Sequence, residues 1–144
     1  MTLAAALLLA ATALHLGFQA VVTLVVYPAL RVERDAPAER WRAVHDAHSR
    51  RIAPLVVAVY GVLALAGVSV LFDGIDVWQG VALGLSGFVV ATTAFAGAPL
   101  HGALGCTDDP ARRAALLRRL AVADAVRLGG AAAAFGAAVV GAVR

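Results

Sequence analysis

Lysine is absent from this sequence, and cysteine occurs once, at Cys106. A single cysteine excludes an internal disulfide, and no CxxC or Cys/His zinc spacing is present. Charged residues make up only 15% of the 144 residues and aromatic residues 6%, whereas hydrophobic residues make up 62%. A soluble core of this size does not need so much apolar material. The composition therefore predicts one integral membrane domain covering residues 1–144.

Four apolar runs are each long enough to form a membrane span, which takes about 20 residues for a ~30 Å hydrocarbon core. The expected spans are about residues 3–27, 52–72, 77–100 and 120–143. Backbone groups in lipid must be hydrogen-bonded within their own segment, so each span is predicted to be a helix. Short connections then favour an all-α, up-down-up-down four-helix bundle.

Two segments carry signals for helix starts. Asp35-Ala36-Pro37 and Asp108-Asp109-Pro110 each combine an N-capping residue with a proline in the first turn. The second helix is therefore expected to begin near Ala36, and the fourth near Pro110. Gly80 and Gly84 form a GxxxG pair, which predicts close approach of the third helix to a neighbour.

The arginines predict an orientation. Residues 31–51 hold six arginines and residues 102–119 hold four, whereas the turn around Asp73 and Asp76 holds none. The positive-inside rule places both arginine-rich connections in the cytoplasm and both termini outside, for a protein of the inner (plasma) membrane. Since topology explains the arginines and no recognition motif is present, a nucleic-acid partner is not expected.

The first span carries a polar stripe. Thr12, His15, Gln19, Thr23 and Tyr27 follow one another at spacings of three and four, which places them on one helix face. His15 lies 12 residues from Tyr27, roughly 18 Å deeper at 1.5 Å per residue. Polar groups at such depth usually face protein or a water-filled cavity. They either serve a site or simply hydrogen-bond across the bundle.

Further ionisable groups stand near the arginine-rich ends of the other helices. His45 and His48 share a helix face, one turn after Trp41, and could chelate a metal or belong to an amphipathic interfacial segment. Asp124 and Arg127 have the spacing of an intrahelical ion pair. That pair either pins the fourth helix or binds a substrate oxygen.

The antiparallel arrangement would bring His45, His48, His101 and Asp124 into one layer, with His15 and Arg127 deeper. This predicts a pocket in the cytoplasmic half of the bundle, floored by His15 and Gln19. Such a set of side chains can hold a transition metal or carry out metal-free proton transfer.

The order of these motifs resembles the anthrone oxygenase-like family of small four-helix membrane proteins. The resemblance rests on Tyr27-Pro28-Ala29-Leu30 closing the first span, Ala98-Pro99-Leu100-His101 closing the third, and Asp124-Ala125-Val126-Arg127 in the fourth. His101 and Asp124 stand where the family commonly has asparagine. Family members with an assigned activity oxidise anthrones to anthraquinones with dioxygen. The resemblance implies that Pro99, His101, Asp124 and Arg127 touch a substrate.

The sequence is compatible with three functions. The first is an oxidoreductase or oxygenase acting on a hydrophobic, aromatic or quinone-like molecule without a required cofactor. Its catalytic residues would be His15, His101, Asp124 and Arg127, and its substrate contacts Gln19, Tyr27, Trp41 and Pro99. The second is a metal or haem protein with copper, iron or zinc bound by His15, His45, His48 and His101. The third is a non-catalytic small membrane subunit. A homo-oligomer is compatible with each function.

Overall fold

A computed structural model describes all 144 residues, and the chain is helical apart from its ends and three short connections. The prediction of four apolar helices is confirmed, because each is long and apolar enough to cross a membrane. The first consists of α1 (Leu3–Val21), η1 (Val22–Val26) and α2 (Tyr27–Val32), and the second is α3 (Ala38–Asp73). The third consists of α4 (Val77–Thr92), η2 (Thr93–Gly97) and α5 (Ala98–Gly105), and the fourth is α6 (Pro110–Val143).

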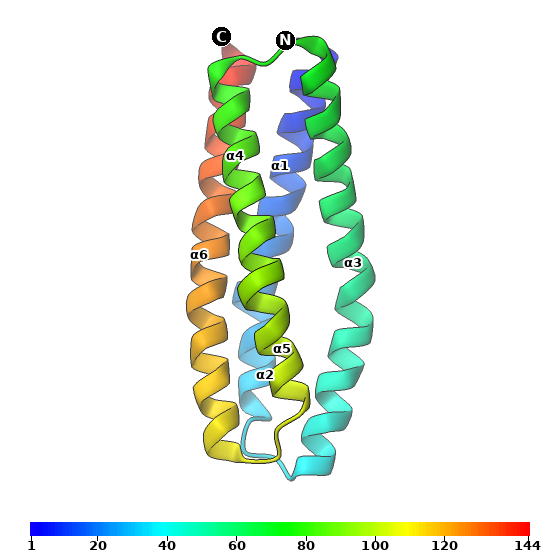
Figure 1. The fold of residues 1–144 in the computed structure, drawn as a ribbon, viewed down its shortest axis with the longest axis vertical. Helices are drawn as coiled ribbons and strands as arrows, with labels where there is room; N and C mark the ends of the chain where they lie inside the picture. The colour runs from blue at the N-terminus through cyan, green and yellow to red at the C-terminus, as the bar shows by residue number, and fades with distance from the viewer.

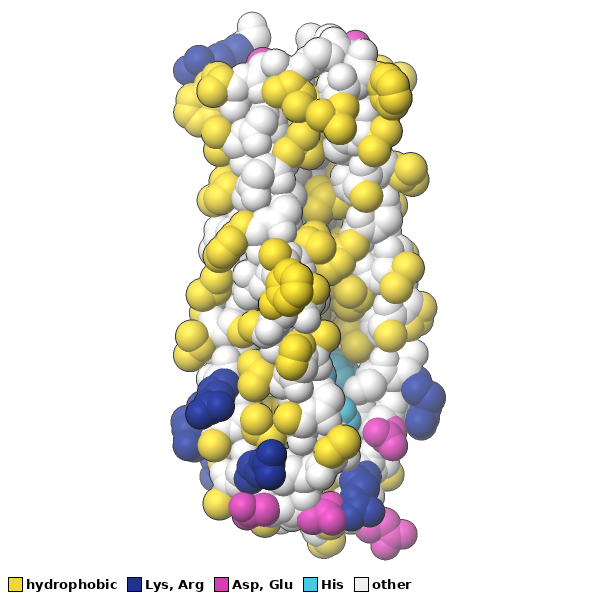
Figure 2. All heavy atoms as spheres, viewed as in Figure 1, with side chains coloured by type: hydrophobic (Ala, Val, Ile, Leu, Met, Phe, Trp, Pro, Cys, Tyr) yellow, Lys and Arg dark blue, Asp and Glu magenta, His cyan; other side chains and the backbone are white.

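The four long helices lie side by side, with both termini and the connection 74–76 at one end of the molecule (Figure 1). The connections 33–37 and 106–109 lie at the other end. Most of the charged side chains visible in the space-filling view gather toward that second end (Figure 2). We call it the arginine-rich end.

The surface of the bundle is apolar along most of its length, as lipid contact requires. Phe95 is 85% exposed and Val57 is 72% exposed, while Asp124 and Arg127 are almost completely buried. This inversion, with hydrocarbon outside and ionisable groups inside, is the distribution expected of a bundle in a bilayer.

The helix starts agree with the sequence at one connection and differ at the other. Asp109 caps α6, since its carboxylate accepts a hydrogen bond from the Ala111 amide at 2.9 Å. Helix α3 begins at Ala38, because Pro37 has an extended ψ of 147° and occupies the N-cap position without a side-chain cap. The Asp35 carboxylate, predicted to cap this helix, instead accepts from Arg34 Nε at 2.9 Å.

Two π-helical turns interrupt the first and third long helices, and each directly precedes an X-Pro pair. The Tyr27 amide donates to the Val22 carbonyl just before Pro28, and the Ala98 amide donates to the Thr93 carbonyl just before Pro99. A proline inside a helix lacks an N–H and its ring clashes with the carbonyl four residues earlier. A wide π-turn relieves that clash, and π adjustments of this kind let membrane helices tolerate proline.

The helices do not pack equally on one another. Helix α6 packs along α1 and α4, and α1 packs along α3, whereas α3 and α4 meet at few points. Gly84 is not a point of close approach, because a Cβ added there would meet nothing within 4 Å, and a Cβ added at Gly80 would meet only Ile75 at 3.7 Å. The close approach occurs instead at Gly130 of α6, where an added Cβ would lie 2.7 Å from Val89 of α4.

Arg113 stabilises the arginine-rich end through hydrogen bonds to backbone carbonyls. Its side chain, only 1% exposed, donates to the carbonyls of Arg34 and Ala36 at 2.9 and 2.8 Å and to the Asp108 carbonyl at 2.9 Å. Its guanidinium also lies over the Trp41 ring at 5.4 Å. Arg113 therefore ties both connections of this end to α6.

Candidate functional site

The ion pair expected from the spacing in the fourth helix is confirmed. Arg127 Nη2 lies 2.9 Å from Asp124 Oδ1, and both side chains are buried. The same carboxylate oxygen accepts a hydrogen bond from Gln19 Nε2 of α1 at 2.5 Å. The carboxylate thus neutralises the buried cation and joins α6 to the polar stripe of the first helix.

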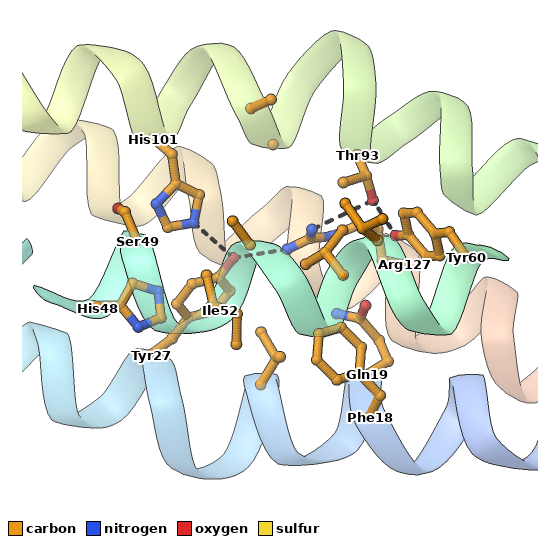
Figure 3. A pocket seen from close by; sticks show the side chains of 16 residues that line it. Phe18, Gln19, Tyr27, His48, Ser49, Ile52, Tyr60, Thr93, His101 and Arg127 are labelled. Carbon is orange, nitrogen blue, oxygen red and sulfur yellow. Dashed lines mark hydrogen bonds between the residues drawn. The ribbon is translucent and has the colours of Figure 1, made fainter. Parts of the chain in front are cut away.

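Arg127 also reaches a tyrosine–histidine pair (Figure 3). Its Nη2 donates to the Tyr27 hydroxyl oxygen at 2.9 Å, and that oxygen lies 3.1 Å from His101 Nε2. A guanidinium can only donate, so the hydroxyl oxygen accepts from Arg127, and the hydroxyl hydrogen is free to point to His101. In the tautomer that carries its ring hydrogen at Nδ1, neutral His101 accepts this hydrogen bond at Nε2.

The remaining donors of Arg127 are weakly used. Its Nη1 lies 3.5 Å from Thr93 Oγ1, a long contact, and its buried Nε has no hydrogen-bond partner. Thr93 Oγ1 is already engaged with the Tyr60 hydroxyl at 2.6 Å. Figure 3 shows Arg127 between Tyr27 on one side and Thr93 and Tyr60 on the other. The guanidinium can therefore donate to another oxygen without losing its hydrogen bonds to Asp124 and Tyr27.

A pocket of about 350 Å³ lies beside this network. Its wall is mostly apolar and comes from α1, α3 and the η2–α5 segment, with residues such as Phe18, Ile52, Val56 and Ala98. Its polar groups are Gln19, Tyr27, His48, Ser49, Tyr60, Thr93, His101 and Arg127. A concave apolar site with a few converging polar groups is typical of small-molecule binding.

Glycine makes room for the guanidinium. A Cβ added at Gly97, in the π-turn η2, would lie 3.2 Å from Arg127 Nη1. A Cβ at this position would press on the Arg127 side chain, which would have to shift by a few tenths of an ångström. The π-turn places Thr93 and Gly97 beside Arg127, and π-turns occur frequently at functional sites.

Three histidine rings stand together at the side of the pocket nearer the arginine-rich end. The His101 ring centroid lies 5.8 Å from those of both His45 and His48. Gly105 leaves space for His45, since an added Cβ would lie 3.2 Å from its ring. The rings pack face to face or tilted.

The histidines are not arranged as the predicted metal site. No group of three or more His, Cys, Asp or Glu side chains is placed so that it could hold a metal ion. His15 packs edge-on against Tyr60, with 5.4 Å between the ring centroids, and both its nitrogens are buried without partners. The set His15, His45, His48 and His101 therefore lacks support as a ligand sphere.

The pocket includes some of the predicted site residues and leaves others out. Gln19, Tyr27, His48, His101 and Arg127 line it. Asp124 stands behind Arg127, and His15 and His45 reach the site only through neighbouring rings.

Like Asp124, two further residues expected to touch a substrate, Trp41 and Pro99, do not line the pocket. Trp41 is fully buried and its indole N–H donates to the Leu104 carbonyl at 2.9 Å, so it stabilises the arginine-rich end. Pro99 is exposed, and its neighbours Gly97 and Ala98 line the pocket instead. The π-turn before Pro99 turns this part of the helix so that the proline faces outward.

Sequence reasoning missed Tyr60, Thr93 and Gly97. A signal for the first existed, because Tyr60 is one of only two tyrosines and lies in the middle of an apolar span. Thr93 and Gly97 carried no comparable signal, since small residues are common throughout the membrane helices.

Comparisons with known proteins found no match to this chain, whether among protein-family models, curated proteins or solved structures.

Proposed function

We propose that this chain is a membrane-embedded oxidoreductase, oxygenase-like in its chemistry, that acts on a hydrophobic aromatic or quinone-like molecule. One observation carries the proposal: a buried guanidinium with unused donors lies at an apolar pocket, beside a hydrogen-bonded tyrosine–histidine pair. The pocket suits a flat apolar ring system, and the guanidinium suits one oxygen on that ring.

Arg127 would bind the substrate oxygen through Nη1 and stabilise the negative charge that develops there when the substrate loses a proton. Preorganised donors in a water-poor site are effective because they need no reorganisation during the reaction. Asp124 and Gln19 hold the guanidinium in place from behind. Asp124 is therefore a positioning residue.

Tyr27 and His101 would move the proton. The Tyr27 hydroxyl lines the pocket and lies 3.1 Å from His101 Nε2, to which it would donate its hydrogen. As the hydroxyl oxygen takes a proton from an acidic C–H or O–H of the substrate, it passes its own proton to the imidazole. His101 is thus the base, acting through Tyr27.

For a substrate with a CH₂ group between aromatic rings, the balance is one substrate and one O₂ giving one ketone and one water. The carbanion left by deprotonation forms a C–O bond to O₂, and the resulting peroxide loses water as the second C–H bond breaks. The substrate supplies all the electrons, so this route requires no cofactor. The resemblance of the sequence motifs to the anthrone oxygenase-like family supports this reaction class.

We further propose that the arginine-rich end faces the cytoplasm and both termini face outside the inner (plasma) membrane. The ten arginines of the two connections support this orientation, because arginine is enriched on the cytoplasmic side of membrane proteins. The pocket would then lie in the cytoplasmic half of the bilayer.

The catalytic proposal is tested by oxygen uptake with anthrone in nanodiscs. We expect Arg127→Gln to lower turnover by about 10²–10³, the usual effect of removing one donor to an oxyanion. Arg119→Gln is the matched control, because Arg119 is an exposed arginine of the same helix that lines no part of the pocket. Turnover that persists in both Arg127→Gln and His101→Ala would rule the mechanism out.

A further inference from the structure

A second hollow adjoins the pocket and extends it toward the middle of the molecule. Its volume is about 280 Å³, and Tyr60 belongs to the walls of both. From Tyr60 it runs between α3 and α4, past Leu63, Gly67 and Gly87. We call it the α3–α4 groove. It contains no charged side chain.

The groove exists because α3 and α4 pack poorly on each other. These helices meet at few points, while their other neighbours are closely packed. Figure 2 shows a furrow between α4 and α3, with hydrophobic side chains in its depth and histidine side chains visible in its lower part. The pocket and the groove therefore adjoin at Tyr60 on the side of the molecule between α3 and the third long helix, where lipid would lie.

The two compartments differ in chemistry. The pocket holds the guanidinium, the tyrosine hydroxyls and two histidines, whereas the groove is apolar apart from Ser86 and the shared Tyr60. Tyr60 turns its hydroxyl to Thr93 at the pocket side. An occupant of both compartments must have a polar ring at one end and a hydrocarbon chain at the other.

We infer that the substrate is a lipid-tailed phenol whose ring enters the pocket and whose hydrocarbon tail lies in the α3–α4 groove. This inference rests on the proposed function for the identity of the ring. Entry between α3 and α4 from the bilayer needs no opening of the arginine-rich end, which Arg113 holds closed. The groove orients the molecule with its oxygen toward Arg127.

The length of the groove sets the scale of the tail. From Tyr60 to Gly67 the helix rises roughly 10 Å, at 1.5 Å per residue. A chain of several carbon atoms beyond the ring fills this distance, and a longer tail continues into the surrounding lipid. A substrate without a tail fills only the pocket.

Photo-crosslinking in nanodiscs tests the inference. The probe is a phenol with a decyl chain that ends in a diazirine. We expect it to label α3 and α4 around residues 63–67 and 83–90, and we expect excess para-cresol to suppress that labelling by displacing the ring. Labelling spread evenly over the lipid-facing helices, or unaffected by para-cresol, would overturn the inference.

A matched pair of variants sharpens the test. Gly87→Leu places a side chain in the groove, and its Cβ would meet nothing within 4 Å. Gly129→Leu adds the same side chain at a position of α6 where a Cβ is equally free and which lines neither the pocket nor the groove. We expect Gly87→Leu to weaken suppressible labelling by at least about tenfold, as overfilling an apolar site does, and Gly129→Leu to leave it unchanged. Equal labelling of the two variants would overturn the inference.

Oxygen uptake separates this inference from the proposed function. Suppressible labelling of the groove without any turnover of anthrone or tailed substrates would disprove the catalytic proposal and leave the tail site standing. Turnover of anthrone with no suppressible labelling would do the reverse. Tailed substrates should lose turnover in Gly87→Leu, while anthrone should be oxidised as by the unmodified protein.

Discussion

The Asp124 carboxylate is the buried counter-ion of the Arg127 guanidinium. It is the only anion in contact with Arg127, and both are removed from solvent. Replacing it by asparagine leaves an uncompensated buried guanidinium, which typically costs about 3–5 kcal/mol of folding free energy. We therefore expect Asp124→Asn to lower the stability of the protein in detergent strongly, measured by equilibrium unfolding.

The same pair allows a coupling measurement. The double variant Asp124→Asn/Arg127→Gln removes both charges and should recover much of the lost stability, because no unpaired ion remains. Asp73→Asn is the matched control, since Asp73 is an exposed carboxylate outside any ion pair. Additive losses in the double variant would show that the two charges do not stabilise each other.

A second ion pair at the residue scale predicts a pH dependence. Arg42, hydrogen-bonded to Asp108, lowers the pKa of that exposed carboxyl below its ordinary value. A lowered pKa in the folded state adds stability that is present above the ordinary carboxyl pKa. That stability is lost as the pH falls through the lowered pKa. The effect is small and screened by salt, because both side chains are exposed.

We expect Asp108→Asn to melt slightly below the unmodified protein near pH 7, and the two melting temperatures to converge as the pH falls below the ordinary carboxyl pKa and through the lowered one. The measurement is a series of thermal unfolding curves at low salt. In about 1 M salt the difference near pH 7 should shrink, as screening predicts. A difference that grows on acidification would contradict this account.

At the scale of elements, the π-turns explain why the site is assembled at all. Each places one extra residue in a helix just before an X-Pro pair, and Tyr27 follows one turn while Thr93 and Gly97 belong to the other. The prolines thus act on the site from outside it, by setting the rotation of the helices that carry these residues.

Pro99→Ala restores a backbone N–H and removes the ring, so the preceding π-turn is free to become α-helical. Thr93 and Gly97 would then rotate relative to His101. We expect folding stability to hold or rise, because Pro99 is exposed, while oxygen uptake with anthrone falls at least about tenfold, as small misplacements of reacting groups commonly cause.

Pro54→Ala is the matched control for this element. Pro54 lies inside α3, which continues through it without a π-turn, so its replacement should leave the helical register of the flanking pocket residues Ile52 and Val56 unchanged. Equal losses of turnover in the Pro54 and Pro99 variants would show that the π-turn has no specific role.

The elements also show what sequence alone could predict. The four helices follow from long apolar runs, and the Asp124–Arg127 pair follows from local spacing within one helix. The contacts of Arg127 with Tyr27 and of Tyr60 with Thr93 join different helices, so they depend on rotations that the π-turns set and that periodicity does not reveal. Trp41 and Arg113 are residue types that are common at membrane interfaces. Their hydrogen bonds to backbone carbonyls distant in sequence could not be predicted from that.

At the scale of the whole molecule, uneven packing connects fold and site. Helix α6 supplies the ion pair and packs against both α1 and α4, whereas α3 covers the pocket and barely touches α4. Close packing on one side holds the charged network rigid, and loose packing on the other leaves a lateral opening. A uniformly packed bundle of these helices would bury the network but admit no apolar ligand.

The single cysteine provides a direct test of orientation. Cys106 is exposed at the arginine-rich end, so a membrane-impermeant maleimide should label it in inverted vesicles and not in intact cells if that end is cytoplasmic. Cys106→Ser combined with Gly74→Cys moves the thiol to the connection 74–76 at the opposite end, and its labelling should be reversed. Labelling of Cys106 in intact cells would invert the proposed orientation and place the pocket in the outer half of the bilayer.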